Sequence, residues 1–376
     1  MMKVLLQKKL WSWTKQFFLN LPQSKGYGRL ILATVISGTL FLGCSEEVLE
    51  PLPPVGNFSN GIFISNEGGF NRGNASVSFY NPLSNEVIQN VFETVNNRPL
   101  GDVLQSMIIR DGKVFLVVNN SSKIEIVDLN DFTEISTIEE LISPRYIQFI
   151  DNNAAYVSDL FGNSIAVVDL NTNETTNQIP IGGWSEEMVK IGNEVFVTQP
   201  SFQGNTISNQ LFIINTISNE IIDSIEVGYN PVSLELDKNN NLWVLCNGEF
   251  GSNDKLGGLY QINPSNRQAT KAFPFTDNQV SFAPRLAMNG ERDQLYFLKI
   301  DIFSLSIEAE SMPNNPLIEA NGRDLYGLDV HPETGEIYVG DSGNFVQQGT
   351  VTIHDENGIQ IKTFKAGVGI NGFYFN

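Results

Sequence analysis

The sequence has little cysteine, little histidine and few basic residues for its length. Its 376 residues include two Cys and two His, and 42 acidic side chains stand against 23 basic ones. Two cysteines cannot build a disulfide framework, so the fold must depend on a hydrophobic core. A strongly acidic surface repels phosphate backbones and anionic lipid headgroups. The composition therefore argues against nucleic-acid binding, and it names no activity.

The N-terminal residues 1–43 have the pattern of a signal peptide. They carry six basic side chains and no acidic one, and residues 30–42 (LILATVISGTLFL) form an apolar run of 13 residues. A helix of that length is too short to cross a bilayer comfortably, which favours a cleaved signal over a permanent span. Removal of this segment leaves 17 basic and 42 acidic side chains. The rest of the chain is thus even more acidic than the whole.

Residues 40–44 (LFLGC) resemble a bacterial lipobox, in which the cysteine is lipidated and begins the mature protein. The resemblance implies a lipid anchor at Cys44 that holds the protein on a membrane. Ser45, Glu46 and Glu47 resemble the acidic export signal that sends Bacteroidetes lipoproteins to the outer face of the outer membrane. Residues 44–57 also include the Pro-rich segment EPLPPV. We expect this segment to form an extended tether facing the cell exterior.

Residues 58–376 repeat one pattern seven times. Short runs of β-branched and aromatic residues alternate with Asn, Gly, Asp and Pro turns, and no long stretch has a helical period. One run recurs as IFIS, VFLV, AYVS, VFVT, LWVL, LYFL and IYVG at intervals of 40–53 residues. This interval is typical of propeller blades. The sequence therefore predicts an all-β fold, a seven-bladed β-propeller with four-stranded blades.

The two ends of the repeat array predict how the ring closes. Five of the seven runs directly follow a tight polar turn, such as RDGK or DNNA, of the kind that joins antiparallel strands. If the strand before each turn is innermost, the chain begins on a second strand and ends on an innermost one, residues 370–375. Each four-stranded sheet needs neighbours on both sides to bury its two apolar faces. We therefore expect the C-terminal strand to complete the first blade.

The same strand order places two sets of loops on one face, around the central channel. These loops join the outermost strand to the next innermost strand, and the second strand to the third. They carry most of the large aromatic and Arg side chains. Aromatic side chains exposed on polar loops are unfavourable in water, so their presence there indicates a binding surface. Aromatic faces with amide groups suit a large, flat, uncharged or weakly charged ligand, although some of these residues could instead plug the channel or pack between blades. The candidate ligand-binding residues are Phe70, Arg98, Arg145, Tyr146, Phe161, Trp184, Phe202, Tyr229, Phe250, Arg285, Tyr326 and Phe345.

Residues suited to catalysis are scarce on this loop face. His331 and His354 lie in turns assigned to the opposite face, so neither is placed to act there as a general base. Cys246 lies near the end of an apolar strand, as buried packing cysteines do. The acidic residues of the face lack calcium-loop spacing, but carboxylates from different blades could still converge on a cation. The sequence predicts a protein without enzyme activity, catalytic residues, a cofactor or a metal site.

The repeats resemble the YVTN-type seven-bladed propellers. The first three, GIFISNEGGFNRGNASVSFYNP, RPLGDVLQSMIIRDGKVFLVVNNSSKIEIVDL and SPRYIQFIDNNAAYVSDLFGNSIAVVDL, look like the cobalamin-capturing surface lipoproteins of Bacteroidetes, the BtuG type. The resemblance covers about residues 57–376 and is strongest over residues 61–170. It implies a lid-like propeller on a TonB-dependent outer-membrane transporter, which holds cobalamin (vitamin B12) or a related corrinoid on its loop face and passes it on. The resemblance does not identify which individual residues of this sequence would bind the ligand.

Two other classes of function stay open from the sequence. The loop face could bind another transporter cargo, a glycan or a surface protein, with its aromatics along one rim instead of round the channel mouth. A metal-dependent lyase or lactonase would need carboxylates from several blades that converge on a divalent ion, which a metal analysis would detect.

Overall fold

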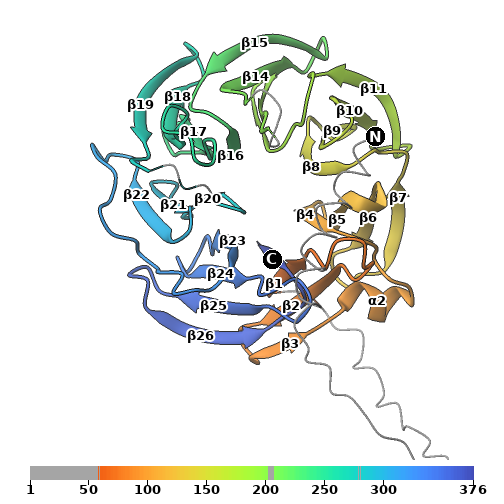
Figure 1. The fold of residues 1–376 in the computed structure, drawn as a ribbon. Helices are drawn as coiled ribbons and strands as arrows, with labels where there is room; N and C mark the ends of the chain where they lie inside the picture. Colours follow the sequence, from red (N-terminus) through yellow and green to blue (C-terminus); the bar gives the residue numbers. More distant parts are fainter. Residues whose placement is uncertain (1–57, 59, 202–206, 278, 280) are drawn as a thin grey trace, which may run out of the picture. The chain divides into compact units, whose positions relative to one another are not determined.

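The computed structural model describes residues 58, 60–201, 207–277, 279 and 281–376, all within one compact unit. Seven antiparallel sheets surround a central channel (Figure 1). Six sheets contain four strands and one contains three. These findings confirm the all-β seven-bladed propeller. The predicted signal peptide and tether, residues 1–57 with Cys44, lie outside the described residues.

The blades follow one another along the chain, and each runs outward from the channel. Between the first two blades lies helix α2 (Val91–Asn96), and one 3-10 turn, η1 (Asn119–Ser121), follows the second strand of the second blade. Blade by blade, from the innermost strand outward, the strands are β27 (Ile370–Phe375), β1 (Ile62–Asn66), β2 (Ser76–Asn81) and β3 (Glu86–Ile88); β4 (Leu104–Arg110), β5 (Lys113–Val118), β6 (Lys123–Asp128) and β7 (Glu134–Ile138); β8 (Pro144–Phe149), β9 (Ala154–Asp159), β10 (Ser164–Asp169) and β11 (Glu174–Pro180); β12 (Met188–Ile191), β13 (Glu194–Thr198), β14 (Gln210–Asn215) and β15 (Glu220–Glu226); β16 (Pro231–Leu236), β17 (Leu242–Cys246), β18 (Gly258–Asn263) and β19 (Gln268–Pro274); β20 (Arg285–Met288), β21 (Gln294–Leu298) and β22 (Ile302–Ser306); β23 (Leu325–Val330), β24 (Ile337–Asp341), β25 (Thr350–His354) and β26 (Gln360–Lys365).

The second strand of each blade is buried on both faces. In β5, Val114, Leu116 and Val118 pack against the first blade, whereas Phe115 and Val117 pack against the third. Successive side chains of a strand point to opposite faces, so a continuous apolar run serves two neighbours at once. This explains why the recurring runs VFLV or IYVG contain no polar alternation.

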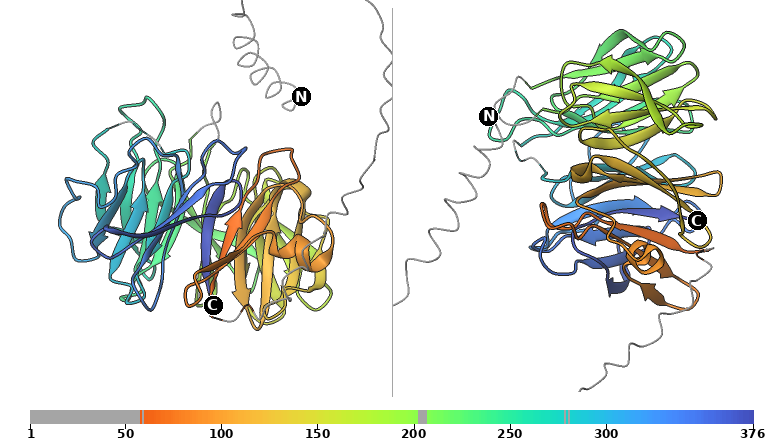
Figure 2. Two further views of the ribbon diagram at one scale, coloured as in Figure 1. Left: turned by 90° about the horizontal axis from the view of Figure 1, so that it is seen from below. Right: turned by 90° about the vertical axis from the view of Figure 1, so that its right-hand side faces the viewer.

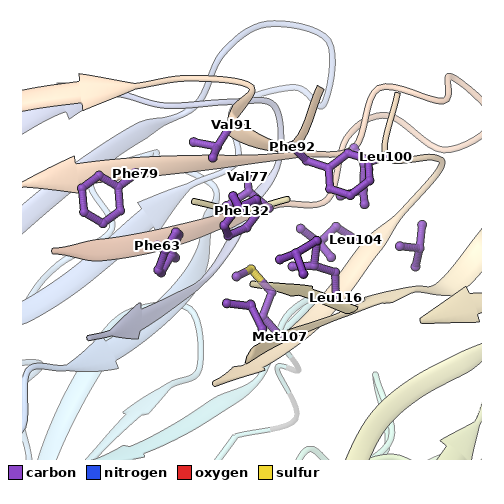
Figure 3. Close-up of a cluster of buried hydrophobic side chains, with 14 of the residues drawn as sticks. Phe63, Val77, Phe79, Val91, Phe92, Leu100, Leu104, Met107, Leu116 and Phe132 are labelled. Atoms are coloured by element: carbon purple, nitrogen blue, oxygen red, sulfur yellow. The ribbon is translucent and has the colours of Figure 1, made fainter. Parts of the chain in front are cut away.

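The buried hydrophobic residues that the structure describes form seven clusters, one between each pair of adjacent blades. Figure 3 shows the cluster between the first and second blades, where Phe63 of β1 and Met107 of β4 point toward each other. The rings of Phe63 and Phe132 stack there with centroids 5.2 Å apart. Each blade is therefore stabilised mainly by its two neighbours, and a gap in the ring would expose two clusters.

The first blade joins the two ends of the propeller. β27 pairs antiparallel with β1, so residues some 300 positions apart in the chain form one ladder. Figure 2 shows the strands running between two faces, with the C-terminus at one of them. The predicted closure by the C-terminal strand is confirmed.

Two local features depart from the four-strand repeat. The sixth blade has no regular outermost strand, and only an isolated bridge joins Ile302 to Ile318. Pro313 and Pro316 lie in this segment, and proline cannot donate to a strand ladder. After the short outer strand of the first blade, α2 buries Val91 and Phe92 in the first cluster. In the described part of the chain, no helix is long and apolar enough to cross a membrane.

Candidate functional site

A pocket of about 500 Å³ opens at the channel mouth, on the face formed by the long loops. Its lining comes from six of the seven blades, the second to the seventh. The loops that reach it join an outermost strand to the next innermost one, or a second strand to a third, as the strand order predicts. Five of the predicted ligand-binding residues line it together: Arg145, Trp184, Phe250, Arg285 and Tyr326.

Two more of the predicted residues do not line the pocket but contact side chains that do. The Tyr146 hydroxyl accepts a hydrogen bond from Arg285 Nη1 at 3.2 Å, and the Phe345 ring packs edge-on against Tyr326 with centroids 5.0 Å apart. Phe345 has a positive φ of 55°, and a Cβ atom on Gly369 would lie 2.9 Å from its ring. The glycine is therefore needed for the ring to reach Tyr326.

The other predicted residues do not line the pocket. Phe70 and Phe161 are exposed elsewhere, with 63% and 53% of their surface accessible, and Tyr229 is half-buried beside Gly248. Phe202 lies outside the described residues.

Arg98 points away from the pocket and takes part in the packing of the second blade. Its guanidinium forms a bidentate pair with Glu125 of β6 at 2.9 Å and also pairs with Glu134 of β7. It lies 4.8 Å from the centroid of the Phe92 ring. These contacts engage the guanidinium within the blade, which leaves it poorly placed to meet a ligand at the channel mouth.

Arg145 anchors one wall of the pocket through a buried ion pair. Its Nε and Nη2 donate to the two carboxylate oxygens of Glu186 at 2.8 and 2.6 Å, and Nη1 donates to Gln105 at 2.5 Å. Trp184 Nε1 donates to the same carboxylate at 2.5 Å, and the guanidinium lies 5.5 Å from the Trp184 ring centroid. The indole is therefore held in one orientation at the pocket wall.

Tyr326 forms the opposite wall and is fixed from below. Its hydroxyl donates to Glu67 Oε2 at 2.5 Å, and its ring lies 6.2 Å from Phe282. Burial raises the pKa of Glu67, and the hydrogen bond from Tyr326 partly offsets this. Phe282, Tyr326 and Phe345 thus form a continuous aromatic wall. Sequence reasoning missed Phe282 and Glu67, although Phe282 adjoins the predicted Arg285 in the segment SFAPR.

The pocket rim combines exposed aromatics with braced loops. Phe250 and Phe282 expose 73% and 87% of their surface. The Asn247 side chain bridges to the next blade, where it exchanges two hydrogen bonds with the Ser281 backbone at 3.0 Å. Asn230 likewise joins Ser201 N to Gly248 O. The side-chain amides of Asn230 and Asn247 therefore hold the loops in place, which lowers the entropy cost of binding.

Below the mouth, three carboxyl groups face the channel without an ion pair in the described residues. Burial raises the pKa of Glu187 to about 7, that of Glu235 to about 8 and that of Asp329 to about 7. Glu187 and Asp329 each accept backbone hydrogen bonds, from Leu234 N and Phe373 N. A smaller cavity of about 200 Å³ lies beside Tyr146 and Glu187.

The raised pKa of Glu235 gives stability a defined pH dependence. In the unfolded chain this carboxyl ionises near its ordinary value, whereas the folded protein keeps the proton up to about pH 8. The unfolded state then binds fewer protons at this group, so the contribution of Glu235 to stability falls as pH rises between about 4.5 and 8. We expect Glu235→Gln to raise the free energy of unfolding at pH 8 by on the order of 2 kcal/mol, with little change at pH 5.

Urea unfolding at pH 5, 6.5 and 8 measures this difference. The exposed Glu220 of β15 supplies a matched control, because Glu220→Gln should change stability equally little at each pH. A Glu235→Gln effect that is the same at pH 5 and pH 8 would contradict the assignment.

No group of three or more His, Cys, Asp or Glu side chains in the described ranges is arranged to hold a metal ion. Cys246 is free and fully buried in the cluster between the fourth and fifth blades. His354 is buried and its ring hydrogen-bonds Thr352 and the Gly358 carbonyl, and His331 follows β23 at the hairpin face.

Residues 60–376 match the family model described as "Domain of unknown function (DUF5074)". The chain belongs to the DUF5074 family. Among curated proteins the sequence has no match.

Solved structures share the DUF5074 propeller fold at low identity. A quinonprotein alcohol dehydrogenase-like protein from Bacteroides thetaiotaomicron is 16% identical, with a TM-score of 0.66 over 85% of this chain and 79% of that one. The periplasmic gluconolactonase of Pseudomonas aeruginosa is 12% identical, with a TM-score of 0.62 over 84% and 98%. A dihydro-heme d1 dehydrogenase, NirN, in complex with DHE is 10% identical, with a TM-score of 0.52 over 85% and 76%. Propellers of this fold thus include enzymes, and such identities show the fold alone.

Proposed function

We propose that this protein is a surface lipoprotein whose propeller captures cobalamin or a related corrinoid at the channel mouth and passes it to a TonB-dependent transporter. The observation that carries the proposal is the pocket itself, in which Trp184, Phe250, Phe282 and Tyr326 present aromatic surface around a rigid opening. Exposed aromatic side chains on braced loops suit a large flat ligand with apolar faces.

The size and form of the pocket support partial enclosure of a large ligand. About 500 Å³ accommodates one edge of a macrocycle with its substituents, while the remaining face rests on Phe250 and Phe282, which are 73% and 87% exposed. Capture of this kind needs no chemical step, only a preorganised surface. The lipid anchor at Cys44 and the Pro-rich tether, both read from the sequence, would hold the propeller at the membrane that contains the transporter.

Titration of residues 45–376 with cyanocobalamin tests the proposal. We expect one-to-one binding by calorimetry and retention of the coloured ligand through gel filtration. Phe250→Ala should weaken binding at least about 10-fold, which corresponds to about 1.4 kcal/mol, because it removes stacking surface from the rim.

Ile217 provides the control for this substitution. It is 77% exposed in the turn between β14 and β15, on the hairpin face away from the pocket, so Ile217→Ala should leave affinity unchanged. Wild-type affinity weaker than about 100 µM would refute cobalamin capture and direct attention to other transporter cargo or surface partners.

A further inference from the structure

Phe345 has a backbone conformation that is unfavourable for a bulky residue. It lies in the loop between β24 and β25 and has a φ of 55°. In the left-handed region the side chain crowds the backbone, so glycine and asparagine are the residues most often found there. Two other bulky apolar residues of the described chain, Val103 and Phe132, have φ of 65° and 63°. Both are core residues, with 4% and 0% of their surface exposed, so packing compensates their strain.

Core packing does not compensate the strain at Phe345. The residue is half-buried on a surface loop and belongs to none of the seven clusters of buried residues in the described chain. Its ring instead packs against Tyr326, with centroids 5.0 Å apart and an interplanar angle of 87°. Strained residues of this kind are concentrated at functional sites. The contact with Tyr326 is the structural gain that accompanies the strain.

The first blade provides the space for this contact. A Cβ atom on Gly369 would lie 2.9 Å from the Phe345 ring, and one on Gly69 would lie 2.8 Å from the Phe345 carbonyl oxygen. Glycine at both positions lets the loop of the seventh blade approach the first blade. Glu67 N also donates to Gly369 O at 2.8 Å. The segment that lies against the Phe345 ring thus also holds Glu67, the hydrogen-bond acceptor of Tyr326.

Glu67 and Phe345 restrain different motions of Tyr326. The Tyr326 hydroxyl donates to Glu67 Oε2 at 2.5 Å, which fixes the end of the side chain. A tyrosine ring turns about the axis through Cβ and the hydroxyl oxygen, so this hydrogen bond leaves the ring plane largely free. A contact on the ring itself must set the plane. Phe282 lies 6.2 Å away and is 87% exposed, whereas the perpendicular Phe345 ring lies at 5.0 Å.

We infer that Phe345 is a positioning residue that sets the plane of the Tyr326 ring at the pocket wall for stacking against the ligand. The inference rests on the proposed corrinoid capture, because Tyr326 lines the pocket in which the ligand would bind. Phe345 does not line that pocket, so it acts through Tyr326. An aromatic ring that is already oriented loses less conformational entropy when a flat ligand binds.

Phe345→Asn separates the contribution of the ring from that of the backbone. Asparagine adopts the left-handed region more readily than phenylalanine, so relief of strain offsets the lost ring contact. We expect the melting temperature to change by less than about 3 °C. The affinity of the domain, residues 45–376, for cyanocobalamin should fall at least about 5-fold in calorimetry. Phe345→Tyr keeps the ring and should bind within about 2-fold of the wild type.

A crystal structure of the ligand-free Phe345→Asn domain supplies a second measurement. Tyr326 should keep its hydrogen bond to Glu67, while its ring turns out of the wild-type plane or occupies more than one orientation. Val346→Asn is the matched control, because Val346 is the next residue, is 60% exposed and lies outside the pocket. This variant should bind cyanocobalamin as the wild type does.

Three results would contradict these expectations in different ways. Wild-type affinity of Phe345→Asn, or an unchanged Tyr326 ring plane in its crystal structure, would overturn the inference while capture itself stands. A large fall in melting temperature together with the loss of affinity would assign Phe345 to the stability of the domain and would also overturn it. Absence of cyanocobalamin binding by the wild type would instead refute the proposed function, and the inference with it.

Discussion

Deletion of the last eight residues, 369–376, is expected to abolish folding of the whole propeller. The deletion removes β27, the innermost strand of the first blade, and with it the pairing of that strand with β1. Ile370 and Phe373 leave the cluster between the seventh and first blades, which also contains Tyr338 and Val351. Polar contacts that close the ring are lost at the same time.

Those polar contacts join the first blade to the second. The Asn371 amide donates to the carbonyls of Leu104 and Gln105 at 2.9 and 3.0 Å, and its oxygen accepts from the Ser65 hydroxyl at 2.5 Å. Met107 N donates to the Tyr374 hydroxyl at 2.9 Å. Each loss leaves a buried backbone or side-chain group without a partner, which costs about 1–3 kcal/mol apiece, so the losses together are comparable to the stability of an ordinary domain.

Soluble expression and far-ultraviolet circular dichroism measure the outcome. A variant that lacks only Asn376 is the control, because it loses hydrogen bonds to Gly61 O and Phe58 O but keeps β27 complete. That variant should remain folded with a slightly lower melting temperature. A soluble truncation of residues 369–376 with a cooperative melting transition would show that the first blade closes without its innermost strand.

Glu186→Ala is expected to destabilise the propeller by about 3–5 kcal/mol, because it leaves the Arg145 guanidinium buried without its counter-charge. The exposed fractions of the two side chains are 14% for Arg145 and 6% for Glu186. The same substitution removes the acceptor of Trp184 Nε1. We therefore expect looser packing of the pocket wall and weaker ligand binding together with lower stability.

Urea unfolding at neutral pH quantifies the loss, and two comparisons define its cause. The Lys255–Glu249 pair is exposed, at 40% and 39%, so Glu249→Ala should cost less than about 1 kcal/mol. The double variant Arg145→Met with Glu186→Leu removes both charges and should recover much of the stability. A Glu186→Ala effect no larger than that of Glu249→Ala would mean that the pair is not effectively buried.

The regular part of the fold was predictable because it depends on local pattern. Each of the seven recurring apolar runs became a second strand, as VFLV did in β5, since a strand buried on both faces is apolar at most positions. The missing outer strand of the sixth blade also had a local signal in Pro313 and Pro316, but four strands were expected there from the regularity of the other repeats.

The sequence predicted which face of the propeller carries the candidate site, but not which residues of that face line the pocket. The strand order placed Arg98 and Arg145 on the same set of loops. In the structure, however, Arg98 pairs with Glu125 inside its blade, whereas Arg145 lines the pocket. Nothing in the sequence around either arginine distinguishes them. The partners Glu125 and Glu186 are 27 and 41 residues away, and their meeting depends on how strands and blades are placed.

The sequence by itself determined the number of blades, the order of the strands and the face that carries the long loops, because these follow from strand period, turn chemistry and the need to bury both faces of each sheet. Only the tertiary structure decided which loop residues share a pocket. It brought Glu67 beneath Tyr326 and left Arg285 with a single hydrogen bond. Those contacts join residues from blades far apart in the chain, and their distances follow from closure of the ring.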